Sequence, residues 1–146
     1  MPSTKKSTAK TASIANAANT PAKPAIMNPK EQALADLVGS FAAMVSGCFD
    51  LHRDGRLAPA DQNQWWLLGT AGMRVVVRFD ASWTRIIAKT PPSTAELRHL
   101  GARTDTAVLA IRHAKQIPSS NRLSAAAAEA ATAIDTVDAM VDEVMT

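Results

Sequence analysis

The chain has 146 residues and a formal net charge of +3, and 47% of its residues are hydrophobic but only 4% are aromatic. This length allows one domain, and the single cysteine excludes an internal disulfide, which fits a reducing, cytoplasmic compartment. The longest uncharged apolar run, residues 37–49, is shorter than the roughly 20 residues that span a bilayer. We therefore expect a soluble protein without a transmembrane segment.

Residues 1–28 contain no acidic residue and offer almost nothing to bury, so this segment is predicted to be a disordered tail. Its charge comes from four lysines: Lys5, Lys6, Lys10 and Lys23. Such a basic tail can contact phosphate backbones or other polyanions, or it can serve only to keep the protein soluble. Both interpretations are kept.

A first helix is predicted over residues 29–52, with Asn28 as its N-cap and Pro29 at its first position. Its apolar stripe consists of Leu34, Leu37, Val38, Phe41, Met44, Val45 and Cys48. Small residues repeat every fourth position on a neighbouring face: Gly39, Ala43 and Gly47. Because such a row lets another helix approach closely, we expect tight packing there inside a bundle.

The stretch 50–61 resembles the calcium-binding loop of an EF-hand. Asp50, Asp54 and Asp61 place carboxylates at the first, fifth and twelfth positions, and Gly55 stands at the sixth, where that loop turns sharply. The resemblance implies a calcium ion held by these three aspartates, and therefore a calcium-responsive pair of helices.

The same stretch can also be interpreted as a simple turn between two helices. His52 stands at the third loop position, where an oxygen ligand is expected, and imidazole is a poor ligand for a hard cation. In this interpretation Gly55 is a left-handed C-cap and Pro59 lies near the start of the next helix. We favour the turn, with no metal or other cofactor, because a single degenerate match is a weak signal.

A second helix is predicted over residues 61–89, with a seam of Trp65, Leu68, Gly72, Val75, Phe79 and Ile86. Trp65 is expected in the core and Trp66 at a contact surface. Basic residues lie opposite the seam: Arg74, Arg78, Arg85 and Lys89. This row could follow the phosphates of a nucleic acid, or it could pair with acidic residues elsewhere in the protein.

Two further helices are predicted over residues 93–116 and 121–144. The first of them opens with a capping box formed by Ser93 and Glu96. The last helix is acidic and carries a heptad seam of Leu123, Ala127, Ala130, Ile134, Val137, Val141 and Val144. We expect it to lie against a basic helix, either within the chain or across a dimer.

Together these patterns predict an all-α protein, in which a four-helix bundle over residues 29–146 follows the basic tail. No catalytic constellation can be recognised, so an enzyme is not expected. The favoured function is a helical interaction or assembly protein that self-associates through its heptad and small-residue faces, with itself or another helical protein as partner. The alternatives are nucleic-acid binding without sequence specificity, through the lysine tail and the arginine row, and a response to calcium.

Overall fold

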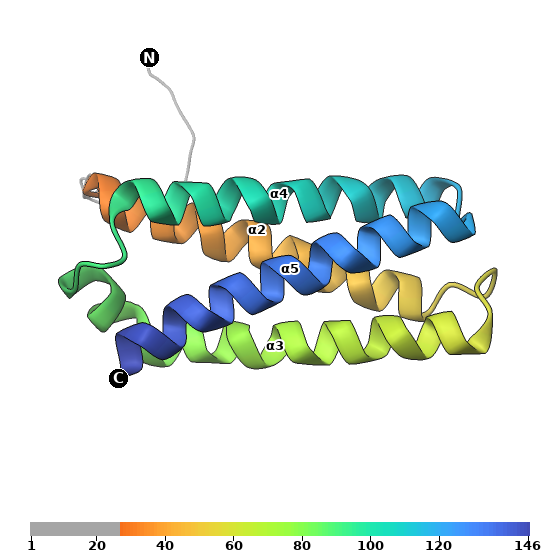
Figure 1. The fold of residues 1–146 in the computed structure, drawn as a ribbon, viewed down its shortest axis with the longest axis horizontal. Coiled ribbons are helices and arrows are strands. Elements are labelled where there is room, and N and C mark those ends of the chain that lie inside the picture. Colours follow the sequence, from red (N-terminus) through yellow and green to blue (C-terminus); the bar gives the residue numbers. More distant parts are fainter. Residues whose placement is uncertain (1–26) are drawn as a thin grey trace, which may run out of the picture.

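The computed structural model describes residues 27–146, and these residues form the predicted all-α four-helix bundle (Figure 1). The helices are α2 (Pro29–His52), α3 (Pro59–Ala88), α4 (Thr94–Gln116) and α5 (Ser120–Met145). The predicted bounds differ from these by two residues or fewer at every helix end. The expected disorder of the tail and its four lysines, Lys5, Lys6, Lys10 and Lys23, lie outside the described residues.

Local side-chain caps mark the starts of α2, α4 and α5, the last through the Ser119 hydroxyl, which accepts from the Arg122 amide. The Asn28 side chain accepts a hydrogen bond of 2.8 Å from the Glu31 amide at the start of α2. At the start of α4, the Ser93 hydroxyl accepts from the Glu96 amide and the Glu96 carboxylate accepts from the Ser93 amide. All of these bonds satisfy backbone donors that a helix start leaves unpaired. The predicted N-cap and capping box are therefore confirmed.

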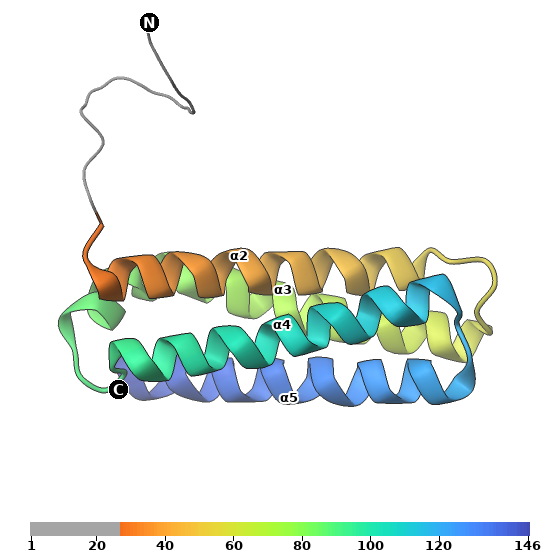
Figure 2. The same ribbon diagram turned by 90° about the horizontal axis from the view of Figure 1, so that it is seen from above.

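The four helices are arranged so that α2 and α5 each pack against both α3 and α4 (Figures 1 and 2). Thus α2 lies diagonally across the bundle from α5, and α3 lies diagonally across from α4. The chain direction shown in Figures 1 and 2 makes α2 parallel to α4, and α3 parallel to α5. The connection from α3 to α4 consequently crosses one end of the bundle, and α5 returns along the groove between these two helices.

The core is built from the predicted apolar seams. Its largest fully buried side chains include Trp65, Phe41, Phe79, Leu34, Leu37 and Met44. All seven members of the α5 seam are also buried within the chain: Leu123, Ala127, Ala130, Ile134, Val137, Val141 and Val144. The expectation that this seam mediates self-association needs correction, because α3 and α4 already cover these side chains.

Only one member of the predicted small-residue row faces another helix. A Cβ atom added to Gly47 would lie 2.7 Å from the Ile111 side chain of α4, so the glycine is needed for this approach. Gly39 and Ala43 are exposed, and a Cβ atom at Gly39 would meet nothing within 4 Å. The expectation of tight packing is therefore confirmed at Gly47 and wrong for the other two positions.

Within residues 27–146, α2 alone is long and apolar enough to cross a membrane by length and composition. Its 24 residues include a window of mean hydropathy 1.4, of which 44% is buried inside the bundle. A core helix of a bundle meets the same criteria. The absence of a transmembrane segment stays a prediction.

Candidate interaction surface

An apolar stripe runs along the outward side of α3. Trp66, Thr70, Met73 and Val77 follow one another at steps of four, three and four residues, the spacing of a coiled-coil seam. Trp66 is 46% exposed, Met73 is 44% exposed and Val77 is 65% exposed. These four residues are called the α3 stripe. Large apolar side chains at this spacing on one exposed face are typical of a surface that contacts another protein.

The α3 stripe exists because α3 is apolar on two sides. Trp65 is fully buried, whereas the next side chain, Trp66, lies about 100° further round the helix and faces outward. The Trp66 ring lies edge-on to the Phe49 ring of α2, with ring centroids 5.7 Å apart, and 5.2 Å from the His52 ring. The predicted division between Trp65 and Trp66 is confirmed in its geometry, and α2 orients the outer ring.

The outer face of α2 beside the stripe is made largely of small side chains. Ala42 and Ser46 are exposed there, and Val38 is half-buried. A hollow of about 390 Å³ opens where the two helices meet, lined by Val38, Val76, Val77, Phe79, Asp80 and Trp83. The α3 stripe together with Val38, Ala42 and Ser46 is called the α2–α3 face. In this face the large side chains protrude from α3, and the small side chains of α2 leave space beside them.

Charge is concentrated at the two ends of this face. From Leu37 to Phe49 α2 carries no charge, and neither does α3 from Trp65 to Met73. Asp80 stands beyond Val77 at one end and is exposed. Arg53, directly after α2, marks the opposite end, where 65% of its side chain is exposed.

The predicted basic row on α3 is largely engaged with α5. Arg78 forms ion pairs with Asp138 and Asp142. The Lys89 ammonium donates to the Val144 carbonyl at 2.9 Å, near the end of α5. These contacts support the expectation that the acidic helix lies against a basic one.

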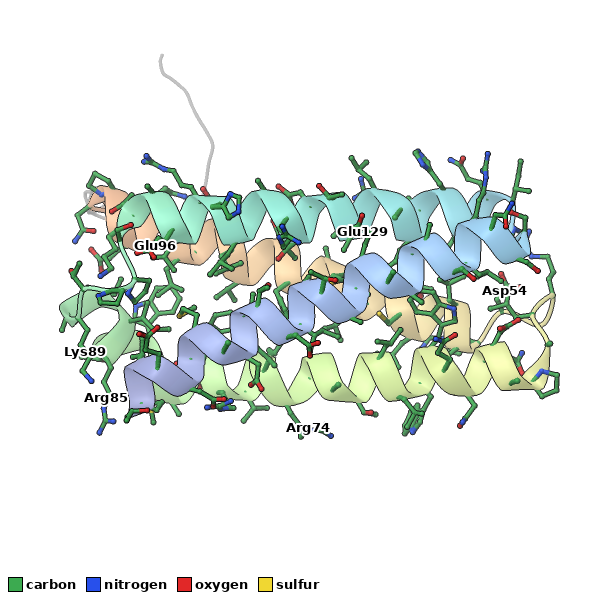
Figure 3. All side chains as sticks on the ribbon, viewed as in Figure 1. Asp54, Arg74, Arg85, Lys89, Glu96 and Glu129 are labelled. Carbon is green, nitrogen blue, oxygen red and sulfur yellow. The ribbon has the colours of Figure 1, made fainter. Side chains whose placement is uncertain are left out.

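The remaining members of the row differ in their surroundings. The Arg85 guanidinium lies 3.9 Å from the Met145 sulfur, whereas Arg74 extends from α3 away from the other helices (Figure 3). The fold therefore does not present four neighbouring basic side chains that are all free to contact phosphates. Nucleic-acid binding stays a prediction that depends mainly on the lysine tail.

The candidate calcium ligands are occupied by basic side chains. The Asp54 carboxylate accepts from the Arg56 guanidinium at 2.7 Å, and these hydrogen bonds lower the pKa of Asp54 to about 2. Asp50 pairs with Arg53 at 2.8 Å and with Lys115 at 2.7 Å.

Asp61 lies in the first turn of α3, where a negative charge interacts favourably with the helix dipole. Among the described residues, no group of three or more His, Cys, Asp or Glu side chains could hold a metal ion.

The turn interpretation of this stretch is supported, with one correction. α2 ends at His52, its C-cap residue Arg53 has right-handed helical geometry, and among residues 27–146 no glycine has positive φ. Gly55 is therefore not the left-handed cap that the sequence suggested. Pro59 opens α3 as its first residue, as a proline at that position favours.

A second hollow lies between α4 and α5 and has a volume of about 470 Å³. Its lining is mostly apolar and includes Pro91, Pro92, Leu100 and Met140, with Glu96 and Glu143 among the polar residues. The Glu96 carboxylate already caps α4, and the hydrogen bonds from Ser93 lower its pKa. These contacts give Glu96 a structural role.

No protein-family model, curated protein or solved structure matches this chain. Its function is therefore inferred from its own residues, and above all from the α2–α3 face. Sequence reasoning missed most of this face, because the seam predicted for α3 describes only the buried side of that helix. The available signal was the 4-3-4 spacing that begins at Trp66, parallel to the seam that begins at Trp65.

Proposed function

We propose that the protein is a non-enzymatic helical assembly protein that self-associates through the α2–α3 face. One observation carries this proposal: Trp66, Met73 and Val77 remain exposed at coiled-coil spacing after the four helices have closed their own core. In this proposal the heptad seam of α5 does not contribute to self-association, because its side chains are buried in the core of the same chain.

The size of the exposed stripe indicates association of modest strength. Full burial of one large apolar side chain contributes about 1.5–3 kcal/mol, and the three large residues of the stripe are about half exposed. Two copies that cover each other's stripe would bury six such side chains, against an association cost of roughly 4–15 kcal/mol. We therefore expect an equilibrium between monomer and dimer that depends on protein concentration.

The test is the mass of the full chain measured by light scattering over a series of concentrations. The wild type should shift from monomer to dimer, and Val77→Asp should stay monomeric where the wild type is dimeric. Leu109→Asp is the matched control, because Leu109 is 53% exposed on α4, away from the α2–α3 face. A wild type that stays monomeric throughout, or equal effects of both substitutions, would contradict the proposal.

A further inference from the structure

We infer that the partner is a second copy of the chain in antiparallel orientation, with α3 of one copy lying along α3 of the other. This inference rests on the proposed self-association and adds its geometry. The two-fold axis would pass near residues 71 and 72, the midpoint of the α3 stripe. Such an interface is isologous, so every contact occurs twice.

The spacing of the stripe is the first argument. Steps of four, three and four residues read the same from either end, so an antiparallel copy stays in register along the whole stripe. Trp66 then lies opposite Val77 of the partner subunit, and Thr70 lies opposite Met73 of the partner subunit. Each large side chain meets a smaller one. A parallel copy would instead place the two Trp66 rings against each other.

The charges at the two ends of the face are the second argument. Antiparallel pairing brings Asp80 opposite Asn63 of the partner subunit. Gln62, one residue earlier, has its carbonyl 2.9 Å from the His52 ring, and Arg53 follows His52 directly. Asp80 therefore comes to the end of the partner that carries Arg53. A parallel copy would bring Asp80 to Asp80 and Arg53 to Arg53, which is repulsive.

The small side chains of α2 are the third argument. Ala42 and Ser46 are exposed beside the α3 stripe, so no large side chain of α2 holds a second copy away. Helices that pack through such surfaces reach axis separations of about 8–10 Å. The α2 helices of the two copies can thus flank the central α3 pair without a clash.

Spin labels on full-length protein test the orientation directly. Arg74→Cys and Thr84→Cys each provide an exposed labelling site, whereas the native Cys48 is fully buried. At 1.5 Å per residue, antiparallel pairing separates the two Thr84 positions by about 38 Å along the helix axis and the two Arg74 positions by only about 8 Å. Parallel pairing predicts short distances at both positions, and that result would overturn the inference.

A charge exchange gives an independent measurement. Asp80→Arg and Arg53→Glu should each weaken dimerisation by about tenfold, because each creates two like-charge contacts in an isologous dimer. The double variant should recover the wild-type dissociation constant. Because Arg53 also pairs with Asp50, the melting temperature of each variant serves as the folding control. Additive weakening in the double variant would overturn the antiparallel arrangement.

The outcomes separate the two proposals. A dimer that Val77→Asp abolishes, but that gives short Thr84 distances, leaves the proposed function standing and overturns the antiparallel geometry. A chain that stays monomeric contradicts both. Vesicles of zwitterionic lipid provide the competing occupant, and a monomer that binds them through Trp66, with binding lost in Val77→Asp, would likewise overturn both.

Discussion

The α5 seam and the α3 stripe are built on the same spacing but end in opposite environments. The seam runs from Leu123 to Val144 in steps of four and three residues, and every member is buried. The stripe runs from Trp66 to Val77 in the same steps, yet Val77 remains 65% exposed. Heptad spacing therefore shows that a helix has an apolar side, but not which surface covers it.

The difference follows from how many sides of each helix are apolar. α5 has one apolar side and an acidic remainder, and its Asp138 and Asp142 pair with Arg78 of α3. α3 has apolar residues on two sides, and the buried Trp65 and Phe79 use only one of them. A helix that is apolar on two sides needs more cover than its two neighbours, α2 and α5, provide. The second side of α3 therefore stays exposed, and it is the surface that we propose a partner covers.

The largest expected effect comes from placing the same charge on each apolar line. Val137→Asp puts a carboxylate at a fully buried position of α5, which should cost at least about 4 kcal/mol of unfolding free energy. Val77→Asp places it at an exposed position of α3 and should change stability by no more than about 0.5 kcal/mol. Chemical denaturation of both variants measures the contrast. Equal losses would mean that the α3 stripe is also part of the core.

Much of the fold could be predicted from the sequence because its signals are local. Asn28, Pro29 and the Ser93–Glu96 capping box define helix starts through contacts within four residues. The periodic seams likewise required only the helical repeat, and they placed Trp65 inside and Trp66 outside. The valine-rich segment of residues 75–77 lies within α3, in agreement with the helix predicted over residues 61–89.

What could not be predicted depends on which helices become neighbours. Gly39 and Gly47 belong to one row of small residues, yet only Gly47 meets α4. Each step of four residues turns the row by about 40° round the helix, so Gly39 faces solvent instead. The role of Gly55 was wrong for a related reason, since α2 closes at Arg53 without a left-handed residue. The availability of the α3 stripe required knowing that the four-helix core closes without it.

A second prediction concerns the thiol of Cys48, which lies on the buried side of α2. Burial raises the pKa of Cys48 to about 12, so the folded protein resists forming the thiolate. Below about pH 9 the thiol is protonated in both the folded and the unfolded protein, so it does not reduce stability. As the pH rises above 9 the unfolded protein ionises first, and the free energy of unfolding falls. We expect a loss of up to about 1.4 kcal/mol per pH unit from this group.

The measurement is denaturant unfolding of the wild type and Cys48→Ala between pH 8 and pH 10.5. The other titrating groups are common to both proteins, so the difference between their pH slopes isolates the thiol. The wild type should lose stability faster than the variant above pH 9. Parallel slopes would show that Cys48 opens to solvent readily, and would weaken the distinction between the covered and uncovered sides of α2.

A third prediction contrasts two glycines of α2, one on its exposed side and one on its buried side. Gly39→Ala adds a methyl group in open space and should stabilise the protein by about 0.5–1 kcal/mol, because alanine favours the helix. Gly47→Ala drives its methyl group to within 2.7 Å of Ile111 and should cost about 1–2 kcal/mol in net stability. Thermal unfolding of both variants checks the signs. A stabilising Gly47→Ala would mean that α2 and α4 can separate at no cost.

The smallest expected effect concerns the ion pairs that tie α5 to the edge of α3. Arg78→Ala removes the pairs with Asp138 and Asp142, which are partly exposed, so it should cost about 1 kcal/mol or less, and less still in high salt. Arg74→Ala, one turn earlier on the same helix and extended into solvent, is the matched control and should be nearly neutral. If the two variants lose equal stability at low salt, the ion pairs of Arg78 do not help to hold α5 on α3. The acidic side of α5 would then not explain why the α5 seam is buried while the α3 stripe is exposed.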